Sequence, residues 1–139
     1  MNELIDKLHE GGYSCVIKSG EHVQTFNRRG VADLLEIYTH RREVLRGALV
    51  ADKVIGKGAA ALMVLGGVQS VYADVISVSA LQLFETHQVA VNYAQCVPNI
   101  INRTKDGICP VESLCQQLTS LDEMLQVIRE FVNEKRVIL

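Results

Sequence analysis

The chain has 139 residues, 48% of them hydrophobic, and a formal net charge of −2. This composition fits a single globular domain over residues 1–139 and excludes a disordered chain, while the negative charge excludes a general nucleic-acid binder. The apolar stretch from Ala59 to Val68 is too short to cross a bilayer, and the N-terminus has no export signal. We therefore expect a cytoplasmic domain without membrane contact, whose four cysteines are reduced thiols.

The first third of the chain predicts a helix, a β-hairpin and a second helical segment. A helix is expected at residues 2–10, where the apolar side chains share one face and Gly11-Gly12 follow. Strands are expected at residues 13–18 and 22–26, separated by a turn at Gly20. A helical stripe then follows, and residues 41–46 are expected to add a further turn or two. The stripe consists of Val31, Leu34, Leu35 and Tyr38.

Strands and helices alternate in the rest of the chain. Strands are expected at residues 47–52, 68–76 and 89–96, and helices at residues 58–66, from Ser77 or Ser79 to His87, from Cys109-Pro110, and from the capping box at residues 120–123. Alternation of this kind implies parallel strands with right-handed crossovers. Together with the hairpin at the front, it predicts a mixed sheet in a three-layer α/β/α sandwich.

Four segments of the chain are similar to an uncharacterised bacterial family, a domain of unknown function that is grouped with the cytidine-deaminase-like superfamily. The segments are residues 47–61, 71–77 and 97–103, and the pair Cys109-Pro110. The resemblance covers nearly the whole chain, and Ala-Asp-Lys-Val-Ile-Gly-Lys is its most specific part. It implies a cytidine-deaminase-like fold and carries no assigned reaction.

Active zinc deaminases need a His-x-Glu or Cys-x-Glu at the start of one helix and Pro-Cys-x-x-Cys at the start of the next. At the corresponding places this chain has residues 53–57, Lys-Val-Ile-Gly-Lys, and residues 75–79, Val-Ile-Ser-Val-Ser. Neither segment offers a metal ligand of the required kind. We therefore expect no metal site, no cofactor and no zinc-dependent deamination.

The strand–helix loop at residues 52–58 is the best candidate for a ligand site. Ligands of open α/β sheets lie beyond the carboxyl ends of strands, and free N–H groups at a helix start attract anions. Gly56 and Gly58 would let a phosphate approach the backbone, and Lys53 and Lys57 add positive charge. The segment from Arg28 to Lys57 contains seven basic and four acidic residues. This local excess of positive charge favours an anionic ligand such as a nucleotide or a phosphorylated metabolite. The alternative interpretation of the loop is a tight turn with two solvated lysines.

Further polar residues follow the later strands and complete the candidate set. Asp74, inside an apolar strand, would either face a pocket or be bonded structurally, and Ser77 would lie beside it or cap the next helix. Asn102 and Arg103 would contact a ligand at the same edge or satisfy loop backbone groups. Cys109, near a helix start, would be either an activated thiolate or a structural residue. A base for that thiolate would come from His22, His40 or His87.

Three functions are therefore open at this point. The leading hypothesis is binding of a nucleotide-like or other phosphate-bearing small molecule at residues 52–58. The second is a zinc-independent enzyme that uses Asp52, Lys53, Lys57 or Cys109 for acid–base or nucleophilic chemistry. The third is a non-catalytic interaction domain that forms a homo-oligomer, most commonly a homodimer.

Overall fold

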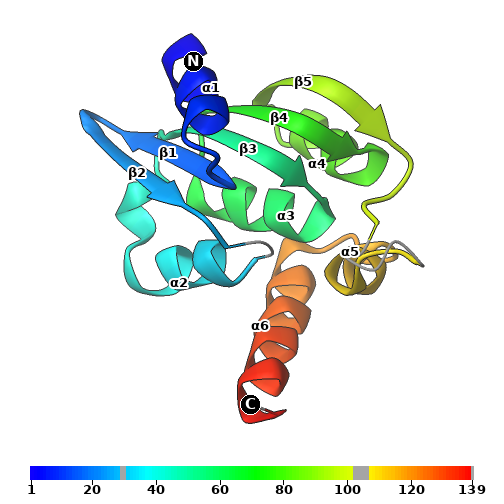
Figure 1. Ribbon diagram of the computed structural model, residues 1–139. Coiled ribbons are helices and arrows are strands. Elements are labelled where there is room, and N and C mark those ends of the chain that lie inside the picture. The colour runs from blue at the N-terminus through cyan, green and yellow to red at the C-terminus, as the bar shows by residue number, and fades with distance from the viewer. Residues whose placement is uncertain (29–30, 102–106, 139) are drawn as a thin grey trace.

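The structure is a computed structural model that describes residues 1–28, 31–101 and 107–138 (Figure 1). Five strands and six α-helices lie within these residues. In chain order they are α1 (Asn2–Glu10), β1 (Cys15–Ser19), β2 (His22–Phe26), α2 (Ala32–His40), the 3-10 turn η1 (Arg42–Val44), β3 (Leu49–Ile55), α3 (Lys57–Gly66), β4 (Ser70–Ser77), α4 (Val78–Thr86), β5 (Ala90–Val97), α5 (Pro110–Cys115) and α6 (Leu121–Ile138).

The five strands form one mixed sheet in the order β2-β1-β3-β4-β5. A two-residue turn containing Gly20, at a φ of +59°, joins β1 and β2 and makes them antiparallel. Strand β1 also runs antiparallel to β3, whereas β3, β4 and β5 are parallel and are connected through α3 and α4. The α/β fold with a mixed sheet that the sequence predicts is confirmed.

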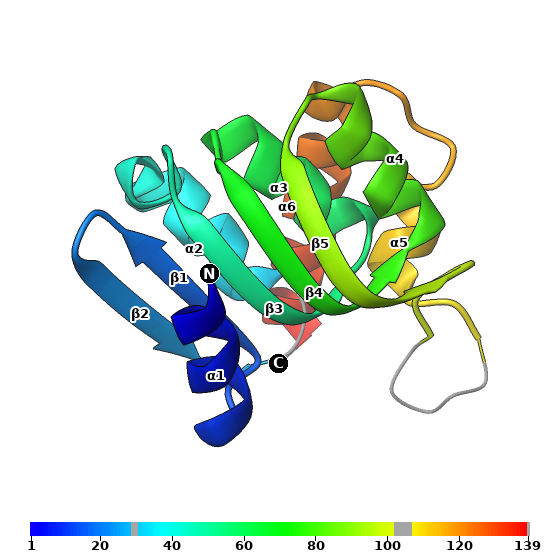
Figure 2. The ribbon, with the colours of Figure 1, turned by 90° about the horizontal axis from the view of Figure 1, so that it is seen from above.

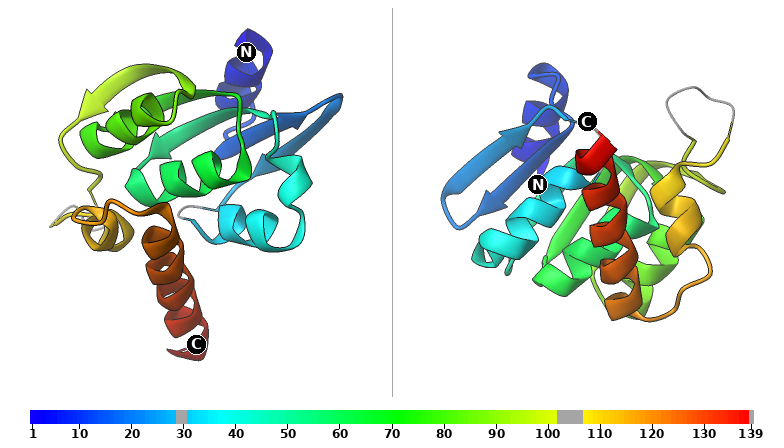
Figure 3. Two further views of the ribbon diagram at one scale, coloured as in Figure 1. Left: turned by 180° about the vertical axis from the view of Figure 1, so that it is seen from behind. Right: turned by 90° about the horizontal axis from the view of Figure 1, so that it is seen from below.

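Helices cover both faces of this sheet (Figures 2 and 3). On one face α1 packs Leu4 and Leu8 against Val16 of β1 and Ala51 of β3. The other face carries α2, α3 and α4, and both α5 and α6 pack against α3. Because α3 has the sheet on one side and α5 and α6 on another, it is apolar all round, and its residues 60–63 are fully buried.

Two predicted boundaries are wrong, and the first affects the candidate site. Residues 52–58 are not a loop: β3 continues to Ile55, α3 begins at Lys57, and Gly56 alone joins them. The strand continues because the β-branched Val54 and Ile55 pair with β4. Residues 41–46 form only the short turn η1, because Arg41 leaves the helical conformation with φ −142° and ψ 49°.

In β3, alternation places Asp52 on the same face as Val50, toward the helices of the larger core. The residue opposite Asp52 on β1 is Cys15, which also belongs to that core. Asp52 is thus a carboxylate inside a central strand, directed at the helical layer. No helix in the described part of the chain is long and apolar enough to span a membrane.

Candidate functional site

A cavity of about 960 Å³ opens on the helical side of the sheet, where β3 ends. Its walls come from β1, β3, the segment before α2, and the helices α2, α3, α5 and α6. Most of the lining is apolar, including Ile17, Leu34, Val54, Ile100 and Val111. Small-molecule sites in open α/β sheets are commonly mostly apolar with a few polar groups and lie at the carboxyl ends of parallel strands, so this cavity is the candidate site.

Asp52 is a buried carboxyl in the wall of the cavity. Its side chain is 9% exposed, and its Oδ1 accepts a hydrogen bond of 3.2 Å from the backbone N–H of Val54. The thiol of Cys15, on the neighbouring strand, also donates to this carboxyl, whereas the backbone N–H of Lys53 donates to the carbonyl oxygen of Ser14 at 3.0 Å. Burial raises the pKa of Asp52 to about 7, a nearby charge on Asp74 adds to the rise, and the hydrogen bonds to the carboxyl oppose it. Near neutral pH the carboxyl is therefore divided between its neutral and ionised forms.

Two cysteines line the same cavity. Burial raises the pKa of the Cys15 thiol well above its ordinary value, and the neighbouring Asp52 raises it further, so Cys15 stays a protonated donor. Cys109 is half-buried and directly precedes α5. None of the histidines considered as its base lies there: His22, His40 and His87 are exposed and do not line the cavity. The structure does not bring a histidine and Cys109 together.

The carboxylate of Glu112, on α5, lies at the start of α3, where the sequence predicts the anionic group of a ligand. It is 1% exposed, and its Oε1 accepts hydrogen bonds from the backbone N–H of Lys57 at 2.9 Å, from Ser77 Oγ at 2.8 Å and from Ser79 Oγ at 3.1 Å. Its Oε2 accepts a hydrogen bond of 2.6 Å from the backbone N–H of Ile100. One carboxylate thus joins the first residues of α3 and α4 to the segment after β5.

The two glycines fit this arrangement. A Cβ on Gly56 would lie 3.4 Å from Glu112 Oε1, so the backbone comes close to a carboxylate of the chain itself. A Cβ on Gly58 would lie 2.4 Å from Val111 Cγ1, so this glycine lets α3 pack directly on α5. Both glycines line the cavity, together with Asp52 and Lys53.

Lys57 does not line the cavity. Its Nζ donates to the backbone oxygens of Gln116, at 3.1 Å, and Leu118, at 2.8 Å, just beyond the end of α5. Its charge therefore stabilises carbonyl groups that the short helix leaves without partners.

The remaining predicted residues lie elsewhere. Asp74 accepts hydrogen bonds of 2.7 Å from His9 and from Tyr72, next to α1. Ser77 is the N-cap of α4, accepting from Ala80 N while it donates to Glu112. Neither lines the cavity, and Asn102 and Arg103 lie outside the described residues. Over residues 1–28, 31–101 and 107–138, no group of three His, Cys, Asp or Glu side chains is placed to hold a metal ion.

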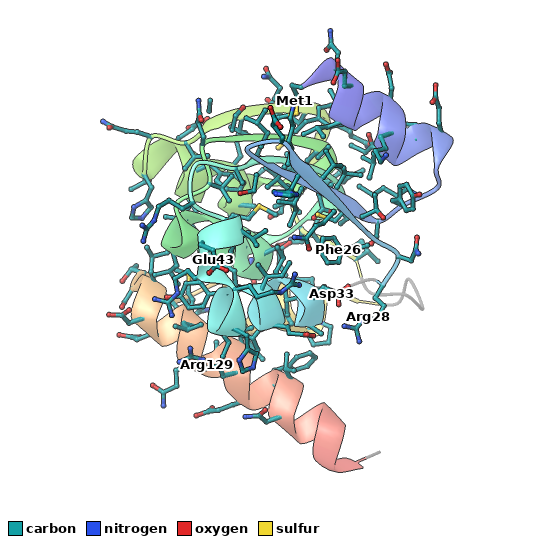
Figure 4. All side chains as sticks on the ribbon, turned by 90° about the vertical axis from the view of Figure 1, so that its left-hand side faces the viewer. Met1, Phe26, Arg28, Asp33, Glu43 and Arg129 are labelled. Atoms are coloured by element: carbon teal, nitrogen blue, oxygen red, sulfur yellow. The ribbon has the colours of Figure 1, made fainter. Side chains whose placement is uncertain are left out.

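An ion pair missed by sequence reasoning lies at the cavity. Arg28 donates to Asp33 Oδ1, with its Nε at 2.9 Å, and both residues line the cavity near Phe26 (Figure 4). Other members of the basic excess are used elsewhere: Arg41 bonds Gln24, and Arg42 stacks on Tyr38 at 4.0 Å from the ring centre. Asp33, an acid in the first turn of α2, is the sequence feature that could have indicated the pair with Arg28. No local pattern in the sequence indicates that Glu112 or Cys15 lines the cavity.

Comparison with known proteins places the chain in a family. The family model described as "TM1506: Domain of unknown function (DUF1893)" matches residues 3–132, so the chain belongs to the DUF1893 family. The crystal structure of a DUF1893 family protein (TM1506) from Thermotoga maritima superposes with a TM-score of 0.85 at 22% sequence identity. The alignment covers 93% of this chain and 87% of that one, and at this identity the likeness shows the fold. A search of curated proteins gave no match.

Proposed function

We propose that this domain binds a small molecule in the cavity at the end of β3, with Asp52 as a principal polar contact. The observation that carries the proposal is a buried carboxyl, with a pKa of about 7, in the wall of a largely apolar cavity of about 960 Å³. Strongly perturbed carboxyls in clefts gather at functional sites, because folding gains nothing from burying them without an ion pair.

The nucleotide-like or phosphate-bearing ligand that the sequence favours remains a proposal, with a changed placement. Glu112 already accepts from the N–H of Lys57, and the Lys57 ammonium is bonded to two carbonyl oxygens. Arg28 and Lys53 are the cationic residues among those lining the described cavity, and Arg28 is paired with Asp33. A ligand phosphate would therefore lie near Lys53 and Arg28 and not at the first turn of α3.

The experiment is native mass spectrometry of the purified protein, followed by thermal unfolding with a panel of nucleosides, nucleotides and sugar phosphates. A ligand at one hundred times its Kd adds about 2.7 kcal/mol to stability. We expect stabilisation to disappear in Ala32→Phe, which narrows the cavity, and to persist in Ala90→Phe, which changes an exposed residue of β5. Stabilisation that survives in both variants, or a protein that nothing co-purifies with or stabilises, would refute the proposal.

Acid–base catalysis is a second candidate, favoured by the same carboxyl. A pKa near the working pH is what a general acid or base needs. The nucleophile hypothesis for Cys109 has less support, because no histidine lines the cavity that it borders. If a bound compound is turned over, Asp52→Asn should abolish product formation, followed by NMR, while binding persists.

The homodimer also remains a proposal, and β5 supports it. This eight-residue strand is one of the two edges of the sheet, most of it is exposed, and it has no charged residue. Pairing with a second copy across a two-fold axis would therefore set no like charges opposite each other. Among the side chains that the structure describes, five of the six exposed large apolar ones belong to α4, β5, α5 and the segment between β5 and α5. They are Val78, Tyr93, Ile101, Ile108 and Leu114.

A further inference from the structure

We propose that Asp52 contacts the ligand as a neutral carboxylic acid, donating a hydrogen bond to an acceptor atom on an uncharged part of the ligand. A carbonyl oxygen or an unprotonated ring nitrogen would serve as that acceptor. The inference rests on the proposed small-molecule function and specifies the ligand chemistry at the inner end of the cavity.

No cation of the described residues contacts the Asp52 carboxyl. Within the described residues Asp52 forms no ion pair, and its hydrogen-bond donors are the backbone N–H of Val54 and the thiol of Cys15. The guanidinium of Arg28, which also lines the cavity, is bound to Asp33. A buried carboxylate without a positive partner has lost its hydration and gained little in return, so the neutral acid is favoured.

The surroundings of Asp52 carry more negative than positive charge. The titratable and charged groups that line the cavity or act on Asp52 come from β1, β3, β4, α5 and the start of α2. They are Cys15, Lys53, Asp74, Cys109, Glu112, Arg28 and Asp33. Three of these are carboxylates and two are cations, so an ionised Asp52 would add to an acidic excess. Consistent with this, burial first and Asp74 second raise the pKa of Asp52 to about 7.

The competing arrangement is an ionised Asp52 that holds a cationic group of the ligand. The two differ in the hydrogen bond at the contact: a neutral acid donates, whereas a carboxylate only accepts. They also respond oppositely to pH, because raising the pH removes the donor and creates the carboxylate. Asparagine at position 52 keeps a donor and an acceptor but has no charge, so it imitates the acid and not the carboxylate.

Benzamide and benzamidine are matched probes for this difference. They share an aromatic ring suited to the apolar walls, but benzamide offers a carbonyl acceptor and benzamidine offers only N–H donors and a positive charge. Binding is measured from amide NMR shifts of cavity residues at pH 6 and pH 8, in the wild-type protein, in Asp52→Asn and in Asp74→Asn. Asp74 is the matched control because it lies on the next strand and does not line the cavity.

We expect benzamide to bind the wild-type protein about tenfold more weakly at pH 8 than at pH 6. The neutral fraction of a group with a pKa of about 7 falls from about nine-tenths to one-tenth over that range, and the apparent Kd follows that fraction. Asp52→Asn should bind benzamide with no such pH dependence. Asp74→Asn should keep the dependence, displaced to slightly lower pH, because one charge that raises the pKa of Asp52 is gone.

Tighter binding of benzamidine that strengthens with pH and disappears in Asp52→Asn would overturn the inference. So would the absence of cavity shifts with either probe in the wild-type protein, a result that does not depend on how the variants fold. The small-molecule function stands after either result if a compound from the metabolite panel still loses its stabilisation in Ala32→Phe. If none does, the function itself is refuted.

Discussion

Replacing Glu112 tests whether its carboxylate holds together three segments that are distant in sequence. The side chain links α3, α4 and the residues after β5 through the N–H of Lys57, the N–H of Ile100 and the hydroxyls of Ser77 and Ser79. In Glu112→Ala all four donors lose a buried acceptor and a void replaces the side chain. In Glu112→Gln the size is kept, but one of the two oxygens becomes an amide donor.

The expected losses follow from these contacts. Hydrogen bonds to a charged group are each worth roughly 1.5–3 kcal/mol, and donors left buried without a partner add to the loss, but such terms are not additive. We therefore expect Glu112→Ala to lower the free energy of unfolding by about 3–5 kcal/mol. Glu112→Gln should lose about 1–3 kcal/mol, because its NH₂ group must face either the Ile100 N–H or the Lys57 N–H, and neither can accept.

Urea unfolding at pH 7, with each midpoint compared at a common slope, measures these losses. The control is Glu123→Gln on α6, an exposed acid whose change should stay within about 0.5 kcal/mol. Hydrogen exchange at the amides of Lys57 and Ile100 should quicken in Glu112→Ala more than exchange in β1 does. A loss in Glu112→Ala no larger than that of the control would show that the carboxylate does not join these segments.

Three further predictions concern the cavity acid, the packing of α3 and the sheet edge. The folded pKa of Asp52, about 7, lies above its unfolded value near 4, so its contribution to stability is complete below about pH 4 and is lost as the pH rises to 7. The whole loss between pH 4 and 7 is up to about 4 kcal/mol, and urea unfolding from pH 5 to 8 should show its upper part, roughly 3 kcal/mol, in the wild type but not in Asp52→Asn. Asp74→Asn should keep a smaller decline, because the charge of Asp74 contributes to the raised pKa. Gly58→Ala should cost about 1–3 kcal/mol despite the better helix propensity of alanine, because its Cβ would meet Val111. Adding Val111→Ala should recover part of that loss, and strictly additive losses would argue against the clash. Tyr93→Lys, on β5 and 44% exposed, should abolish a dimer seen by analytical ultracentrifugation, whereas Val23→Lys, 41% exposed on the opposite edge strand, should not; a wild-type chain that is monomeric at all concentrations would refute the pairing.

The local features of the sequence predicted the elements of the fold well, because each has a local cause. Glycine pairs end helices, Pro110 opens α5, and Ser120 accepts from the backbone N–H of Glu123 at the start of α6. The failure at residues 52–58 also has a local cause. The charge of Asp52 predicts the end of the strand there, but pairing with β4 carries the strand on to Ile55. A central strand can contain a carboxyl such as that of Asp52 where the side chain lines a cavity. The sequence alone does not show where a cavity lies.

The site illustrates why an anion site deduced from a strand–helix junction does not identify a ligand. The expected features are present: a glycine that permits close approach, helix N–H groups, and lysines nearby. The acceptor of the Lys57 N–H, however, is the carboxylate of Glu112, 55 residues further along the chain. The Lys57 ammonium donates to carbonyl groups just beyond α5. Glu112 lies on α5 and the two carbonyl groups follow that helix, whose position depends on the packing of α3 and α6. Physical chemistry at one end of a helix fixes the charge that must meet it, whereas only the tertiary fold decides whether that charge comes from the chain or from a ligand. Here the chain itself provides the negative charge at the start of α3. Asp52 is therefore the buried carboxyl of the cavity for which a ligand can be the partner.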